Sequence, residues 1–180
     1  MSPEKTPEKA TKRTSREAIL DAAEALVREQ GVNRMTLDAV AARAGLSKGG
    51  LLYNFPSKDS LLRGMIERFA ARFNEPGEGS AAGRMIDIRL EALAEKAQHR
   101  QAGHGMLAAI AEKPELLDPM RVAQASLWRT IKETDAAPDR SLIAWLAAEG
   151  LGFLEMFDIS PLNDEERARI AAAIRAMAEG

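Results

Sequence analysis

The sequence predicts an all-α protein with a small N-terminal helical unit followed by a longer helical body. Ala, Leu, Glu and Arg dominate the 180 residues, while aromatic residues make up only 4 %, and these dominant residues favour helices. Apolar residues recur at spacings of three and four along most of the chain, which is the helical period. Glycines and prolines fall between the periodic segments, where helices begin and end.

The first 62 residues contain four predicted helix starts. Thr14-Ser15-Arg16-Glu17 is a capping-box pattern for a first helix that ends at Gly31. Thr36 caps a second helix, which is periodic in apolar residues up to Gly45. Ser47 caps a third helix, and Ser57 begins a fourth. The sequence therefore predicts three short helices and the start of a longer one.

The connection between the second and third helices is the most specific feature of the chain. Gly45 supplies the left-handed conformation that ends one helix, and Ser47 caps the next after a turn of about three residues. Leu46 and Leu51 are placed to form a hydrophobic staple across that cap. Two helices joined by a tight glycine-containing turn form a helix-turn-helix, whose second helix enters the DNA major groove. The alternative is a plain helical hairpin.

Some residues in and near this motif are better suited to DNA than to internal packing. Gly49 and Gly50 each cost a helix interior about 1 kcal/mol, which is reasonable where the backbone approaches a phosphate-lined surface. Lys58 lies in the first turn of a helix, where the dipole disfavours a cation, so an external phosphate would explain it. Thr36 is explained equally well by capping alone. The predicted DNA-binding residues are Thr36, Ser47, Lys48, Gly49, Gly50, Tyr53, Asn54 and Lys58.

The same stretch resembles the N-terminal signature of the tetracycline-repressor (TetR/AcrR) family, Gly-Val-Ser-Lys-Gly-Thr-Leu-Tyr-Tyr-His-Phe-x-Ser-Lys-Glu-x-Leu. This chain has Gly45-Leu46-Ser47-Lys48-Gly49-Gly50-Leu51-Leu52-Tyr53-Asn54-Phe55-Pro56-Ser57-Lys58-Asp59-Ser60-Leu61. Gly50 replaces a usual hydroxyl residue and Leu52 replaces a phosphate-contacting aromatic. The resemblance implies a homodimeric, ligand-responsive repressor that binds a palindromic operator. Residues after the motif resemble the family only in length and helical pattern.

Charge is divided unevenly along the chain. Residues 1–73 carry a net charge of +4 and residues 74–180 a net charge of −6, as expected of a protein that binds DNA with one end. We expect residues 1–14 to be a flexible basic arm, either DNA-seeking or simply solvated. Residues 15–62 would form the DNA-binding domain, and residues 63–180 the effector-binding and dimerisation domain.

The body is predicted to contain helices at 81–99, 104–112, 119–134, 139–157 and 163–178. The helix 139–157 has a row of small residues, and the last helix has two isoleucines that could pack on a second copy as a four-helix interface. The alternative is that both helices close the core of the monomer. The residues predicted at the dimer interface are Ala144, Ala148, Gly152, Ile170 and Ile174.

The same body is expected to bind a small, mostly apolar effector. Met and Trp side chains suit an adaptable apolar pocket, although such residues also form ordinary core. Glu149 could fix a polar or cationic end of the ligand. The predicted effector residues are Met106, Met120, Trp128, Trp145, Glu149 and Phe153.

Several classes of function are excluded by what the sequence lacks. There is no cysteine, which suits a reducing cytoplasm and removes Cys-based zinc or nucleophile chemistry. The two histidines, His99 and His104, are five residues apart and do not form a metal-binding pair. We therefore expect no catalytic residues, metal or cofactor. We also expect no membrane span or signal peptide. The competing function is a helical protein-interaction module without specific DNA binding, against which the uneven charge argues.

Overall fold

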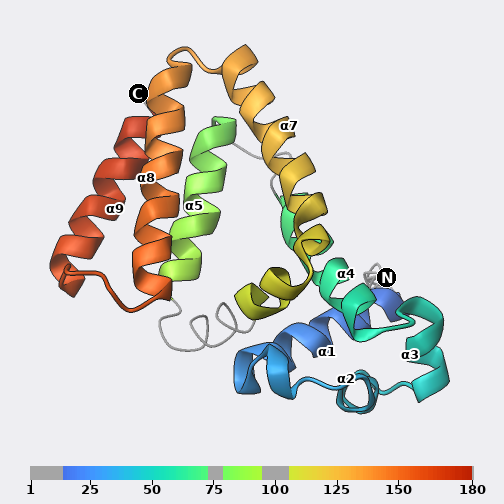
Figure 1. Cartoon of the computed structure of the whole chain (residues 1–180). Helices are drawn as coiled ribbons and strands as arrows, with labels where there is room; N and C mark the ends of the chain where they lie inside the picture. The colour runs from blue at the N-terminus through green and yellow to red at the C-terminus, as the bar shows by residue number, and fades with distance from the viewer. Residues whose placement is uncertain (1–13, 73–78, 95–105, 180) are drawn as a thin grey trace, which may run out of the picture.

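A computed structural model describes residues 14–72, 79–94 and 106–179, and within these ranges the chain is helical with no strand (Figure 1). The elements are α1 Ser15–Gln30, η1 Val32–Arg34, α2 Leu37–Arg43, α3 Lys48–Asn54, α4 Lys58–Ala71, α5 Ala81–Ala94, η3 Pro114–Leu117, α7 Asp118–Thr134, α8 Pro138–Met156 and α9 Asp164–Glu179. Residues 106–112 are also helical. The all-α prediction is confirmed. Residues 1–13 of the predicted arm and both histidines lie outside the described ranges.

The helix starts in the N-terminal part agree with the capping residues read from the sequence. The side chains of Thr14, Thr36, Ser47 and Ser57 each accept a hydrogen bond from a backbone N–H in the first turn of the helix that follows. Gly45 has φ of 69° and provides the predicted left-handed turn between α2 and α3. Local side-chain chemistry therefore sets the boundaries of these short helices.

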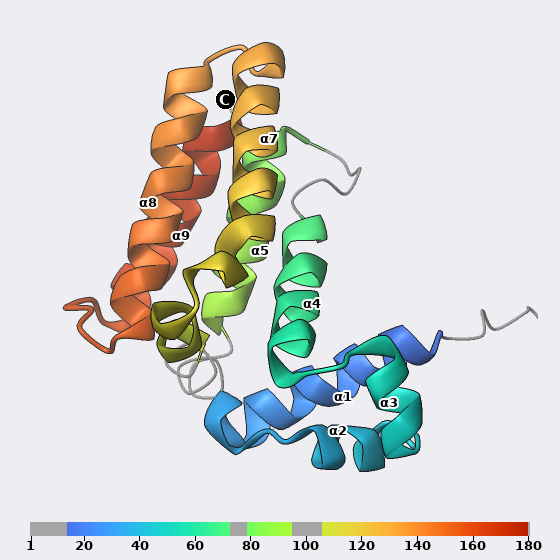
Figure 2. The same cartoon turned by 45° about the vertical axis from the view of Figure 1, so that its right-hand side comes forward.

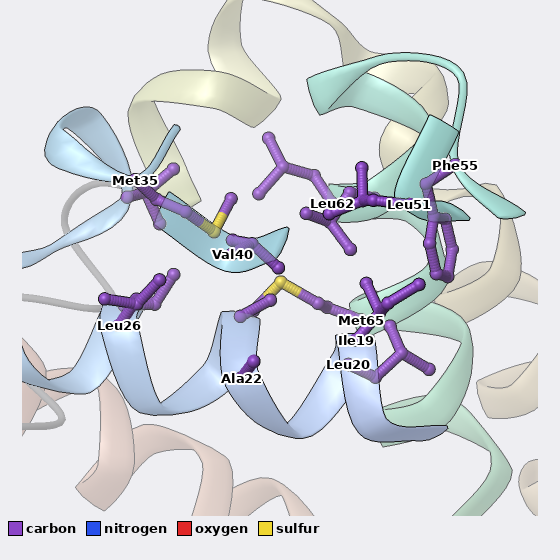
Figure 3. Close-up of a cluster of buried hydrophobic side chains, with 14 of the residues drawn as sticks. Ile19, Leu20, Ala22, Leu26, Met35, Val40, Leu51, Phe55, Leu62 and Met65 are labelled. Carbon is purple, nitrogen blue, oxygen red and sulfur yellow. The ribbon is translucent and has the colours of Figure 1, made fainter. Parts of the chain in front are cut away.

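The N-terminal part has its own apolar core, shown in Figure 3. Ile19 of α1, Val40 of α2 and Leu51 of α3 are completely buried in it. Residues of α4 complete this core, and they include Leu62 and Met65. We call α1, α2, α3 and the beginning of α4 the head; the helices from α5 onward form the body.

Figures 1 and 2 show α4 leading from the head towards the body, where α5, α8 and α9 lie side by side and α7 packs beside them. The body core includes Ile86 of α5, Ile131 of α7, Trp145 of α8 and Ile174 of α9. The order is therefore a helical head followed by a helical body, as predicted.

The orientation of α8 corrects one part of the sequence interpretation. Ala144 and Ala148 are fully buried within the chain. A Cβ added at Gly152 would lie only 2.6 Å from Cζ of Arg89 on α5. The row of small residues thus allows α5 to approach α8 inside the monomer, and it is not available to a second copy. Ile174 is also buried, so it and the row of small residues belong to the monomer core, whereas Ile170 is only partly buried against that core and its place in a dimer interface stays a prediction.

Candidate nucleic-acid interface

The outer face of α3 is fixed by residues on its inner face. Leu51 is completely buried, and Phe55, directly after the helix, is nearly so. Tyr53 lies between them in sequence and is 92 % exposed. A tyrosine in a folded protein normally buries most of its ring, so the exposed ring is unusual in a helix that is anchored by buried residues before and after Tyr53. The Tyr53 ring is therefore free to contact a partner.

Two polar residues of α3, Lys48 and Asn54, each have a partner within the head. The Lys48 ammonium lies 3.0 Å from a carboxylate oxygen of Asp38 on α2. The Asn54 side-chain amide donates to the carbonyl of Gly50 at 3.0 Å. Lys48 is exposed, so its pair with Asp38 contributes little to stability and can exchange for another anion. Lys48 thus remains available at the surface, whereas Asn54 is partly buried.

The two glycines of α3 are not required by packing inside the chain. A Cβ at Gly49 would come no closer than 4.0 Å to Ser47 Oγ, and one at Gly50 no closer than 3.4 Å to the same atom. Both are ordinary contact distances. The structure therefore gives no internal reason for two helix-destabilising residues here, and the predicted close approach of an outside surface remains a prediction.

Lys58 has an internal partner that the sequence did not indicate. Its ammonium donates a hydrogen bond of 2.8 Å to the carbonyl of Val32 in η1, across the head. This contact explains a cation in the first turn of α4 without a bound phosphate. An ammonium has two further N–H donors, so the predicted phosphate contact can coexist with the bond to Val32. A phosphate is no longer needed to explain a lysine at the start of a helix, because the Val32 carbonyl is its partner.

Further ion pairs join α2 and α4 of the head to α1. Arg43 of α2 donates to both carboxylate oxygens of Glu29 on α1, and this bond lowers the pKa of Glu29 and raises that of Arg43. Arg16 pairs with Glu67 at 3.1 Å and lies 5.3 Å over the centroid of the Phe55 ring. These contacts link α2 and α4 to α1, but both ion pairs are exposed and add little stability beyond that of the apolar core.

Comparison with known families identifies this arrangement. The family model described as "Bacterial regulatory proteins, tetR family" matches residues 19–65, which contain α2 and α3. The model described as "Tetracyclin repressor-like, C-terminal domain" matches residues 83–179, more than half of the chain. The chain belongs to the tetracycline-repressor family. It is a transcriptional regulator of that family, and the members are regulators rather than enzymes.

Individual relatives are similar over part of this TetR-family chain or in fold. The HTH-type transcriptional repressor BepR of Brucella suis biovar 1 is 37 % identical over 78 residues, which cover 38 % of this chain and 37 % of BepR. The match thus spans little more than a third of that relative. The regulator SCO7518 of Streptomyces coelicolor A3(2) has the same fold, with a TM-score of 0.63, 21 % identity and coverage of 93 % of this chain and 100 % of its own. The multidrug binding protein EbrR, solved with ethidium, has a TM-score of 0.58 at 19 % identity over 89 % of this chain and 98 % of its own.

The predicted effector residues of this TetR-family regulator do not form one group. Trp128 of α7 and Trp145 of α8 meet edge to face, with ring centroids 5.1 Å apart. Met106 and Met120 instead pack against the core of the head, with Met120 also touching that of the body. Phe153 is about half exposed on the outside of α8 and contacts Phe157. Phe153 is therefore corrected from an interior wall to a surface position, whereas the two tryptophans stay together.

A surface groove of about 370 Å³ lies between α4 and the start of α7, and it contains none of the predicted effector residues. Its lining residues are Arg63, Glu67, Ala70, Ala71, Asp118, Pro119, Val122 and Ala123. The groove is open to solvent, and its charges are already paired: Arg63 with Glu67, and Asp118 with Arg121. It offers no unpaired group to orient a ligand.

Two contacts between the head and the body were not predicted. The Lys113 ammonium, just before η3, forms an ion pair with Asp59 in the first turn of α4. Leu116 of η3 is buried in the core of the head. A sequence signal was present only for Leu116, which with Leu117 forms an apolar pair between charged residues after Pro114. Lys113 could not be paired with a residue 54 positions away on sequence grounds.

The described part of this TetR-family chain has neither a metal-binding cluster nor a membrane-spanning helix. No group of three or more His, Cys, Asp or Glu side chains is close enough there to hold a metal ion. None of the helices described is both long and apolar enough to cross a membrane.

Proposed function

We propose that this protein is a cytoplasmic, ligand-responsive repressor that binds a palindromic operator as a homodimer. The observation that carries the proposal is α3 itself: a short helix anchored by buried Leu51, with Tyr53 almost fully exposed and an exposed Lys48 in its first turn. Such a helix fits the major groove, where base edges are read. Thr36, Ser47 and Lys58 start the helices around it and are proposed to contact phosphates.

An exposed apolar stripe on α8 supports the homodimer. The exposed positions recur every three or four residues along the helix: Ile143, Leu146, Gly150, Phe153 and Phe157. This is the spacing of a helix-packing seam, and a contiguous exposed apolar surface marks an interaction site. Exposed Met177 of α9 adds to it. We propose that two copies pack α8 and α9 through this stripe as a four-helix interface, in place of the buried row of small residues.

The link between head and body supports a response to a ligand. Leu116 is buried in the head core, and Lys113 pairs with Asp59 at the start of α4. A ligand that binds one arrangement of the body better than another would change the position of these residues and thereby the spacing of the two heads. EbrR, which shares the fold, is a multidrug-binding protein, and this supports a small-molecule site in the body.

A gel shift with labelled genomic fragments at two salt concentrations tests the proposal. We expect some fragments to be retained far better than others, and all binding to weaken as salt increases, because phosphate contacts release counterions. Equal retention of all fragments with little dependence on salt would instead support the protein-interaction module. Fragments retained by wild type but released by Tyr53→Ala would place the contact on α3.

A further inference from the structure

Three buried side-chain atoms lack a hydrogen-bond partner in the described residues, and two of them lie on the neighbouring helices α5 and α8. They are Nε of Arg89 and Nε1 of Trp145, both N–H donors. The third, Oδ2 of Asp135, is an acceptor at the far end of α7. A buried donor without an acceptor is destabilising, so native structures rarely keep one without a reason. Each of these two donors in adjacent helices therefore lacks an acceptor that a bound molecule could supply.

Two residues of α8 contact the guanidinium of Arg89. Its guanidinium lies against Gly152, where any larger side chain would collide with it. One of its terminal nitrogens is 3.3 Å from a carboxylate oxygen of Glu149. The side chains of Arg89 and Glu149 are 23 % and 33 % exposed. The arginine head is therefore held in a fixed place, while its partner retains a path to solvent.

Trp145 lies one helical turn before Glu149 on the same side of α8. It is only 7 % exposed, and its ring is held edge to face against Trp128. The successive turns of this side of α8 thus carry an indole N–H, a carboxylate and a glycine that admits an arginine. Apolar ring surface lies beside the polar groups.

We propose that the effector of this regulator carries a carboxylate, which Arg89 and the Trp145 indole N–H bind, while its apolar remainder lies against the tryptophan pair. This inference rests on the proposed ligand response. A carboxylate accepts from both orphan donors and pairs with the guanidinium, which has the geometry to bind it with two hydrogen bonds. An ammonium would meet two N–H donors and a positive charge.

Glu149 has a different role here from the one predicted from the sequence. Instead of holding a cationic end of the ligand, Glu149 pairs with Arg89 in the free protein. Its side chain turns to solvent when the carboxylate of the ligand takes its place. The exchange leaves the charge next to Arg89 unchanged, so a carboxylate can enter a partly buried site without leaving an unpaired ion.

The two indole N–H signals in an NMR spectrum test this directly, because Trp128 and Trp145 are the only tryptophans and Trp128→Phe assigns them. The probes are benzoate, benzamide and benzylamine, and octanoate with its amide and amine. We expect a carboxylate of at least one series to move the Trp145 signal downfield in a saturable way. It should bind at least about tenfold more tightly than its amide, and the amine should not bind.

Variants of the polar groups sharpen the test. Arg89→Gln should abolish carboxylate binding, Trp145→Phe should weaken it by about tenfold, and Glu149→Gln should strengthen it because the competing carboxylate is gone. Arg175→Gln is the matched control, since it removes an ion pair between α9 and Asp87 of α5 without touching the site. Circular dichroism shows whether each variant remains folded, and once Trp128→Phe has assigned the Trp145 signal, titration of the wild type does not depend on the folding of these variants.

The proposal is overturned if amines bind more tightly than carboxylates, if Glu149→Gln weakens carboxylate binding, or if no carboxylate of either series moves the Trp145 signal at millimolar concentration. These measurements use no DNA, so such a failure leaves the DNA-binding function intact. Conversely, carboxylate binding that leaves DNA affinity unchanged would contradict the proposed response to a ligand while supporting this site.

Discussion

The Lys113 ammonium forms an ion pair with the Asp59 carboxylate, and this joins the segment before η3 to the first turn of α4. The contact raises the pKa of Lys113 above its ordinary 10.5, mainly through the hydrogen bond that Lys113 donates to Asp59. It lies beside the place where Leu116 enters the core of the head. This charged pair and this apolar side chain thus add to the packing of Met106 and Met120 that connects the body to the head.

Lys113→Gln should loosen this connection. Because the pKa of Lys113 is raised in the folded protein, its pair stabilises the fold below pH 10.5 and is lost as pH rises through the raised value. Wild type should therefore be more stable than the variant at neutral pH, and the difference should disappear in strongly alkaline solution. Thermal unfolding followed by circular dichroism across pH measures it. A difference that grew with pH would contradict the assigned role.

Tyr53→Ala should reduce DNA affinity by about tenfold or more with little effect on stability. The side chain is 92 % exposed, so its removal should change the free energy of unfolding by less than about 0.5 kcal/mol. Leu51→Ala, on the opposite face of α3, is the matched control and should cost about 2–5 kcal/mol of stability. Fluorescence anisotropy and urea unfolding give the two quantities. Unchanged DNA affinity in a folded Tyr53→Ala protein would remove α3 from the interface.

Lys58→Ala should have two separable effects. Losing the bond to the Val32 carbonyl should lower stability by about 1 kcal/mol. If Lys58 also contacts a phosphate, affinity should fall equally on all sequences and the salt dependence should flatten by about one unit of slope. Lys48 is exposed, so Lys48→Ala should lower DNA affinity without lowering stability. An unchanged salt slope for a folded Lys58→Ala protein would show that Lys58 has only its internal role.

Leu146→Glu should separate the dimer, because it places a charge in the middle of the exposed stripe of α8. Sedimentation should show monomers, and operator affinity should fall since two linked half-sites no longer act together. Val122→Glu is the matched control: Val122 is 71 % exposed on α7, outside the stripe, and its variant should remain dimeric. Ala148→Arg should instead impair folding, since Ala148 is fully buried. A dimer that survives Leu146→Glu would place the interface elsewhere.

The parts of the structure that could be predicted from sequence are those governed by local chemistry. Thr36 and Ser47 mark helix starts in the sequence because a capping side chain accepts a hydrogen bond from a backbone N–H of the turn that follows it. Gly45 marks the turn because few other residues adopt its positive φ. The resulting motif was specific enough to predict both the head and the family, although the residues after it carried no comparable local signal.

The remaining errors concern contacts between distant segments. Helix α8 is apolar on most of its circumference, so its sequence did not show which side faces the core. The row of small residues faces the core, where Gly152 lies against Arg89 of α5. The stripe that includes Leu146 is exposed to solvent. The bond from Lys58 to the Val32 carbonyl was missed because that carbonyl is a backbone atom 26 residues away, and the phosphate contact of Lys58 stays a prediction. Such pairings depend on the tertiary arrangement, which periodicity and capping do not encode.

Selection of binding sites from a pool of random duplexes tests the central claim most directly. Wild-type protein should enrich a palindromic or nearly palindromic sequence whose two half-sites face the same side of the DNA, about 34–36 Å apart or with a relaxed spacing. The Tyr53→Ala protein, selected in parallel, should enrich it poorly. Enrichment of no sequence by a folded, dimeric wild-type protein, or of the same site equally by both proteins, would contradict sequence reading through α3.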